Sequence, residues 1–441
     1  MLDRIINILN ANKDLSDWKI VQNQTEANEL FLIKKQIDMP RSKHINNITI
    51  TAYKDFEEDG KKFRGSSTVN IHPTMTDEEI SNAVKDIAFA ASFIKNQYYT
   101  IPEKSDSEIK SLASKFDNAP LDEWMPKIKD ALYKYDNYDK GYINSSELFL
   151  NKNITTILNS RGVLYSYTSY KGQIELISSW KDAGEEIELY KELMFSDYDP
   201  EALSNAAKDM LEMSMERAKT QPTPSLEGLT VILTGEPVAE VLKHYYTRSS
   251  AQTVYQHVST AKLLESIQGE NIQGDMVNLT IDPALKNSIG SDPVDDDGVI
   301  LTTHKIIENG ILQKYWGSYQ YCQYLNVEPT GRINNLVFEG GSKTIEEMRS
   351  TPHLEIAAFS DFGISTMTGD FAGEIRLGWY YDGKTRVAVS GGSISGNLNN
   401  VQANMYLSKE LQQCTAKEVF QPLGYKGPKA LMMHNISIAG N

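Results

Sequence analysis

Hydrophobic and polar residues alternate in several stretches of the first half of the chain, which is the pattern of half-buried β-strands. The turns between these stretches are rich in Asp, Asn and Gly, as at Glu58-Asp59-Gly60 and Asn159-Ser160-Arg161-Gly162. The second of these turns predicts a hairpin. The predicted strands cover residues 47–53, 62–71, 153–158, 162–168 and 173–180.

Apolar residues at steps of three and four predict amphipathic helices between these strands. The clearest begins after Thr76, where Glu79 completes a capping box, and its apolar face carries Ile80, Val84, Ile87, Ala91 and Ile94. Further helices are predicted over residues 1–10, 121–135 and 200–219. Pro126 lies in the third of these four helices and is compatible only with a first turn, so the start of that helix stays open.

The pattern changes after Thr220–Gly228, a stretch of two prolines, one glycine and small polar residues. Such a stretch ends a helix and keeps the chain extended. Short strands with glycine turns follow. The sequence therefore predicts an α+β protein with an N-terminal domain of antiparallel strands and amphipathic helices (residues 1–219), a linker (220–228) and a β-rich antiparallel C-terminal domain (229–441).

Composition narrows the functional classes. The formal net charge of the 441-residue chain is −15, which disfavours binding to nucleic acid phosphates or to anionic lipid. Two cysteines, Cys322 and Cys414, make no disulfide framework. We find no signal peptide and no run of about 18 apolar residues that could cross a membrane. A cytoplasmic protein is expected, with no nucleic acid or membrane partner.

Common catalytic and metal motifs do not fit. Residues 136–147 resemble a calcium-binding loop in Asp136 and Glu147, but Tyr138 and Lys140 replace two oxygen ligands, so a polar surface loop is expected. No phosphate-binding Gly-rich loop is present. The cluster Gly391–Gly396 misses the spacing of a nucleophile elbow and predicts a turn between strands. None of the seven histidines is followed by glutamate, which excludes a His-Glu-x-x-His zinc helix.

Four blocks of the second half, however, are similar to blocks of one known family. In chain order they are Val294–Val299 with Ile306–Leu312, Thr366–Gly373, Ser393–Leu398 and Ile436–Asn441. With this order and these gaps the chain resembles the TldD/PmbA family, which is related to metallopeptidases and has also been described as modulators of DNA gyrase. The closing block is similar to that of the PmbA branch. In the first half, Gly65–Ile80 and Asn159–Gly162 fit the family more loosely.

The resemblance also indicates what this chain lacks. TldD-type members carry a His-Glu-x-x-x-His helix and a cysteine as zinc ligands, whereas PmbA-type members do not. On this alignment His244 takes the place of the first histidine, Tyr245 that of the glutamate and Ser249 that of the second histidine. The cysteine position falls near Tyr425–Gly427. We therefore assign no catalytic residue, no metal ligand and no cofactor, and expect zinc only in a TldD-type partner.

Two classes of function remain. The first is a non-catalytic PmbA-type subunit, a homodimer or a heterodimer with a TldD-type protease, which helps to form a cleft where an extended peptide binds as an added β-strand. A self-associating peptide-binding protein would look the same in sequence. The second is an active peptidase or hydrolase with a different nucleophile, or with a metal site assembled from distant residues such as His244 and His304. The acidic charge fits either class better than contact with DNA.

Overall fold

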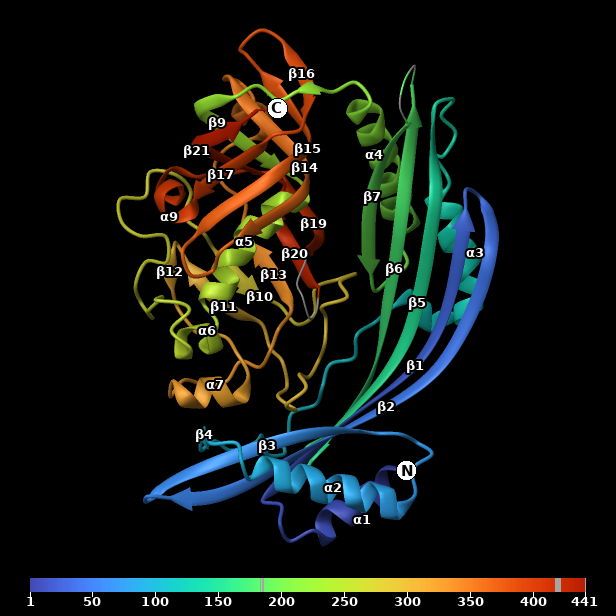
Figure 1. Cartoon of the computed structure of the whole chain (residues 1–441), viewed down its shortest axis with the longest axis vertical. Helices are drawn as coiled ribbons and strands as arrows, with labels where there is room; N and C mark the ends of the chain where they lie inside the picture. Colours follow the sequence, from blue (N-terminus) through green and yellow to red (C-terminus); the bar gives the residue numbers. More distant parts are fainter. Residues whose placement is uncertain (183, 185, 417–421, 441) are drawn as a thin grey trace.

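The N-terminal half is built on one strongly twisted antiparallel sheet, which runs along one side of the computed structural model (Figure 1). The structure describes residues 1–182, 184, 186–416 and 422–440. The strands lie in the order β4-β3-β2-β1-β5-β6-β7. They are β1 (Asp17–Ile33), β2 (Gln36–Glu58), β3 (Lys61–Ile71), β4 (Asn96–Gln97), β5 (Gly141–Asn159), β6 (Leu164–Lys181) and β7 (Glu186–Phe195).

Both predicted turns are present, but two predicted strands are one. Asp59 and Gly60 adopt positive φ between β2 and β3, and residues 159–162 join β5 to β6. The expected strands 162–168 and 173–180 form the single strand β6, because Gly172 does not turn the chain. A Cβ at Gly172 would lie 2.2 Å from the ring of Phe195 on β7, so this glycine makes room for a neighbouring side chain.

Helices cover the sheet at its two ends (Figure 1). At one end α1 (Leu2–Ala11) and α2 (Asp77–Ala91) pack on β1 to β3, and at the other α3 (Leu121–Leu132) and α4 (Pro200–Arg217) pack on β5 to β7. The short turn η1 (Lys115–Asn118) precedes α3. The capping box of Thr76 and Glu79 is formed as predicted.

Three local predictions were wrong. Ile94 lies beyond the end of α2 and is 44% exposed, since the helix stops at Ala91. Pro126 lies within α3, just beyond its first turn. The expected surface loop 136–147 is shorter, because β5 begins at Gly141 and the buried Asp136 accepts a hydrogen bond from the Ile143 N–H at 3.1 Å.

The C-terminal half contains two further sheets. One has the order β12-β11-β10-β13-β20-β19, and the other β14-β9-β21-β17-β15-β16-β8, with β18 beside β21. Because β14 pairs with both β9 and β15, the strands β14, β9, β21, β17 and β15 close into a barrel. The turn predicted around Gly391 and Gly392 is present between β16 and β17. The fold class is α+β, as the sequence predicts.

The strands of this half are short apart from three in the barrel. They are β8 (Gln221–Pro222), β9 (Leu226–Thr234), β10 (Leu279–Ile281), β11 (His304–Glu308), β12 (Ile311–Leu312), β13 (Asn335–Phe338), β14 (His353–Ile364), β15 (Asp370–Tyr381), β16 (Arg386–Ser390), β17 (Ser393–Asn397), β18 (Tyr406–Leu407), β19 (Leu411–Ala416), β20 (Leu423–Pro428) and β21 (Ala430–Ala439).

One helix of this half is central to its core. α5 (Glu236–Arg248) contacts strands of both sheets, β9 and β14 in one and β19 and β20 in the other, and its apolar side joins the largest hydrophobic cluster of the protein. The remaining helical segments are α6 (Ala251–Tyr255), α7 (Tyr319–Tyr324), α8 (Ile345–Met348), α9 (Leu398–Val401) and η2 (Gln402–Asn404).

The expected linker is partly strand. α4 ends at Arg217, Gln221 and Pro222 pair with β16, and β9 begins at Leu226. The extended chain that prolines impose suits a sheet edge, so this segment joins the C-terminal sheet while still connecting the halves. Asn441, at the end of the predicted C-terminal domain, lies outside the described residues. No described helix is long and apolar enough to span a membrane.

Candidate functional site

A large cleft lies between the two halves. Its volume is about 1820 Å³. One wall consists of β7 and α4, and the other of the start of α5 with parts of β14, β15 and β19. In Figure 1, β7 is the strand of the large sheet that lies nearest the C-terminal half. Clefts between domains are preferred places for ligands, which makes this one the candidate site.

The strand β7 brings a sheet edge into this cleft. It is the last strand of its sheet and pairs with β6 alone among the strands that the structure describes. At its start, the Arg376 guanidinium donates to the Glu188 carbonyl oxygen at 3.1 Å. At its end, the Asn287 side-chain oxygen accepts the N–H groups of Ser196 at 3.0 Å and Asp197 at 2.8 Å. Residues of the C-terminal half therefore cap both ends of this edge.

Backbone groups between these caps point into the cleft. In an antiparallel pair, successive residues direct their N–H and C=O alternately toward and away from the partner strand. Since the Glu188 carbonyl faces away from β6, Tyr190 and Met194 face the same way. Within residues 1–182, 184, 186–416 and 422–440, no hydrogen bond engages the outward backbone groups of these two residues. An exposed edge of this kind can accept another strand.

The two walls differ in charge. The wall formed by β7 and α4 carries mainly carboxylates, and the opposite wall carries most of the cations, including Arg349, Arg376 and Arg386. Contacts span the cleft: the Lys191 ammonium lies 3.5 Å from the Glu236 carboxylate, and the Trp379 indole N–H donates to Glu216 at 3.2 Å. The cleft thus has fixed bridges and a polar lining.

His244 is buried in α5 without a hydrogen-bond partner. Its residue is 2% exposed, and neither ring nitrogen has a partner in the described part of the chain. Burial, together with the positive charge of Arg248 one turn further along the helix, lowers the pKa of His244 to about 4. The imidazole is therefore neutral at pH 7, and it does not line the cleft.

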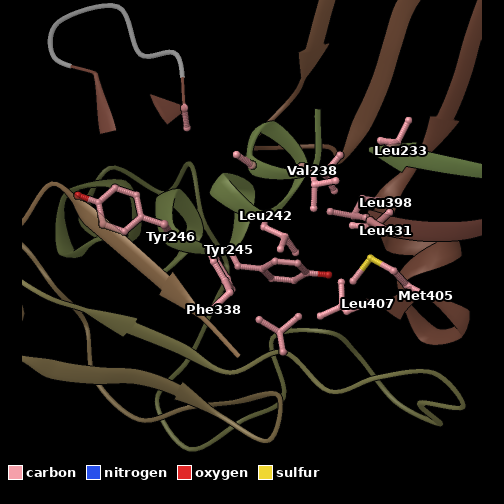
Figure 2. Close-up of a cluster of buried hydrophobic side chains, with 14 of the residues drawn as sticks. Leu233, Val238, Leu242, Tyr245, Tyr246, Phe338, Leu398, Met405, Leu407 and Leu431 are labelled. Atoms are coloured by element: carbon pink, nitrogen blue, oxygen red, sulfur yellow. The ribbon is translucent and has the colours of Figure 1, made fainter. Parts of the chain in front are cut away.

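The other two candidate positions of α5 serve the core. The Tyr245 ring is fully buried among apolar side chains, near Leu242, Phe338, Met405 and Leu407 (Figure 2). Its hydroxyl donates to the Gln402 side-chain oxygen at 2.9 Å. The Ser249 hydroxyl donates to the backbone carbonyls of Tyr245 and Tyr246, each at 2.9 Å. The hydroxyls of Tyr245 and Ser249 therefore both have hydrogen-bond partners within the fold.

Comparison with known proteins places the chain in a family. Residues 227–440 match the PmbA/TldA metallopeptidase C-terminal domain. The metalloprotease PmbA homolog of Buchnera aphidicola subsp. Acyrthosiphon pisum (strain APS) is 25% identical over 290 residues, 60% of this chain and 61% of that protein. Metalloprotease PmbA of Escherichia coli O157:H7 is 25% identical over 205 residues, 45% of this chain and 44% of the relative. The chain belongs to the TldD/PmbA family.

The fold agrees along the whole chain. TldE from Thermococcus kodakarensis is 16% identical and superposes with a TM-score of 0.77, covering 100% of both chains. A Thermotoga maritima protein described as a modulator of DNA gyrase is 18% identical, with a TM-score of 0.73 and coverage of 100% and 99%. In sequence, the match spans at most about 60% of the length of the PmbA relatives. The architecture of both halves is thus that of the family.

The α5 residues of this TldD/PmbA member do not fit a zinc ion. Zinc requires several nitrogen, sulfur or carboxylate ligands around one point. Here Tyr245 and Ser249 are turned to Gln402 and to helix carbonyls, which leaves His244 alone. Among the described residues, no three His, Cys, Asp or Glu side chains form a group that could hold a metal ion. His304 lies on β11, where its ring contacts the Thr302 hydroxyl at 3.1 Å.

One sulfur lies where the sequence did not place it. Cys414 on β19 is paired directly opposite Tyr425 on β20, in the region where the sequence resemblance led us to expect the position of the family's cysteine. It also lines the cleft. Burial raises the pKa of the Cys414 thiol well above its usual range, which favours the protonated thiol over the nucleophilic thiolate. Sequence reasoning also missed Arg376 and the β7 edge, for which no local motif exists.

Proposed function

We propose that this chain is a PmbA-type subunit without a catalytic site of its own, which binds an extended peptide in the cleft as a strand added to β7. The observation that carries the proposal is the capped edge of β7, where Tyr190 and Met194 direct backbone groups into the cleft. Strand addition uses main-chain hydrogen bonds and therefore accepts many sequences. This property suits a protein that acts on unfolded or extended peptides.

A proline substitution tests strand addition directly. Met194→Pro removes the outward N–H of β7 without removing a hydrogen bond to β6, a position where edge strands tolerate proline. We expect peptide affinity to fall about tenfold, measured by fluorescence anisotropy with unstructured labelled peptides. Met194→Ala keeps the N–H and is the matched control. Equal peptide binding by both variants, with both folded, would contradict the proposal.

The partner in this proposal is a TldD-type chain that supplies the zinc. The family scaffold combined with an α5 that offers only His244 as a ligand supports this division of labour. Co-expression with the TldD-type chain of the same genome is expected to give a complex that degrades unfolded protein faster than the TldD-type chain alone. If the two chains do not associate, or proteolysis does not change, this chain acts without such a partner, for example as a homodimer.

One observation favours the alternative of an active hydrolase. Both nitrogens of His244 are buried without partners in the described residues, and a ligand could use one of them. Metal analysis of the purified protein decides between the two functions. Stoichiometric zinc that is lost in His244→Ala would establish a non-standard metal site and remove the proposal of a subunit without metal. A metal content well below one ion per chain would support it.

A further inference from the structure

We infer that Arg376, supported by the charge of Arg217, binds the C-terminal carboxylate of a peptide strand that lies antiparallel along β7. The inference rests on the proposed function and adds to it the class of ligand, a peptide with a free C-terminus, and its direction in the cleft.

Neither arginine has a carboxylate partner among the described residues. Arg376 makes one hydrogen bond, to the backbone carbonyl of Glu188. Arg217 donates one N–H to the Thr220 hydroxyl at 2.8 Å, and its buried Nε has no partner within the described chain. Elsewhere in the cleft, Arg349 and Arg386 both bind the buried Glu355. The chain has 59 acidic and 44 basic residues, so a cleft cation that lacks a carboxylate partner, as Arg376 does within the described residues, is available to an anion from outside.

The two arginines are close enough to repel each other. Burial and the positive charge of Arg376 together hold the pKa of Arg217 below its usual value. Like charges in a partly buried place destabilise each other, and a carboxylate bound by Arg376 would offset that repulsion. A guanidinium also matches the planar geometry of a carboxylate, because it can donate two parallel hydrogen bonds. The pair is therefore suited to a carboxylate more than to a neutral group.

Its place on β7 determines what would carry that carboxylate. The Glu188 carbonyl is already occupied by Arg376, so an added strand cannot continue past this residue. A strand running antiparallel to β7 has its C-terminal end here, next to Arg376. A parallel strand would instead bring its N-terminal end, and a terminal ammonium would be repelled. The charges thus favour the antiparallel direction and a strand that ends at its own C-terminus.

The outward backbone groups of Tyr190 and Met194 lie four positions apart on β7. Strands pair residue against residue, so a peptide strand that engages both would contribute roughly five residues. At the other end of β7, the Asn287 side-chain oxygen accepts the backbone N–H groups of Ser196 and Asp197, so the edge available to a peptide ends there. Preceding residues of a longer peptide would leave the cleft at that end.

Paired peptides test this inference with the full chain. We would measure the affinity of N-terminally labelled, unstructured peptides of about ten residues, each prepared with a free C-terminal carboxylate and as the C-terminal amide. For the unchanged protein, amidation is expected to weaken binding about tenfold, the effect of losing one charge-assisted contact. In Arg376→Gln the acid and amide forms should bind alike, and Arg217→Gln should reduce their difference.

The control is Arg386→Gln, which removes a cleft cation that already has Glu355 as a partner. It should keep the preference for the acid. Competition by inorganic phosphate identifies a general anion site: displacement of the amide peptide as readily as of the acid would overturn the inference. Equal affinity of acid and amide in the unchanged protein would also overturn it while leaving strand addition intact. No binding of either form would instead remove the proposed function.

Discussion

At the scale of single residues, His244 stands out as a buried imidazole on α5 whose ring nitrogens have no hydrogen-bond partner within the described residues. The imidazole packs edge-on against the Tyr245 ring and lies one turn from Arg248. A buried polar group without a partner costs stability. Its neighbour Tyr245 instead satisfies its hydroxyl with Gln402. The apolar side of α5 thus belongs to the hydrophobic core, and His244 is its polar exception without a hydrogen bond.

His244→Leu should stabilise the protein, most strongly in acid. The pKa of His244 is about 4 in the folded protein against 6.5 for a free imidazole. The unfolded chain thus binds a proton between these values, and stability falls as pH falls through that window. The leucine variant lacks this loss, which amounts to about 2 kcal/mol at pH 5. Urea unfolding at pH 5 and pH 8 measures it. A variant less stable at both pH values would mean that the imidazole makes a favourable contact.

At the scale of secondary structure, the packing of α2 on the sheet depends on one glycine. A Cβ at Gly65 on β3 would lie 1.7 Å from the Ala91 carbonyl oxygen at the end of α2. The helix approaches the strand so closely that no side chain fits between them. The capping box fixes where α2 begins, and this contact fixes where its last turn lies.

Gly65→Ala should destabilise the protein by about 1–3 kcal/mol, the usual cost of overfilling a packed contact. The backbone of α2 would have to move, since the clashing atom belongs to the main chain. Gly363→Ala is the control, because a Cβ there meets nothing within 4 Å. Thermal unfolding of the two variants provides the comparison. Equal midpoints would show that α2 shifts without cost.

At the scale of the whole molecule, contacts between the halves set the geometry of the cleft. Two of these contacts lie outside the cleft. The Lys19 ammonium on β1 lies 2.8 Å from the carboxylate of Asp297, and the Gln323 side chain on α7 forms hydrogen bonds with the backbone of Thr100. Near the cleft itself, Trp379 bonds to Glu216. The edge of β7 and the cations opposite are held in place by these bridges.

A double-mutant cycle should reveal the energetic coupling of the ion pair between Lys19 and Asp297. Lys19→Met and Asp297→Asn are each expected to lower the free energy of unfolding, with a coupling of about 1–2 kcal/mol for this partly exposed pair. Although burial alone favours the neutral acid, the Lys19 ammonium holds the pKa of Asp297 below its usual value. This contribution is therefore present above about pH 4 and is lost as pH falls further. Additive effects at pH 7 would refute the coupling.

Much of the fold followed from local patterns. The turns at Asp59-Gly60 and residues 159–162, the capping box of α2 and the apolar face from Ile80 to Ala91 depend on residues a few positions apart. The wrong predictions arose where contact with a residue distant in sequence determined the local structure. Gly172 stays in a strand because Phe195 needs its space, and Ile94 lies outside α2, whose last turn packs against Gly65 of β3.

The sequence by itself determined the α+β class and the family, because both are written in residue types at short spacing. Only the tertiary structure decided that β7 ends a sheet inside a cleft, that Cys414 lies opposite Tyr425, and that Arg376 reaches the carbonyl of Glu188, 188 positions earlier. The physical reason is that an unpaired strand edge or an unpaired cation is defined by what is absent beside it. That absence depends on how the two halves pack, and no local spacing records it.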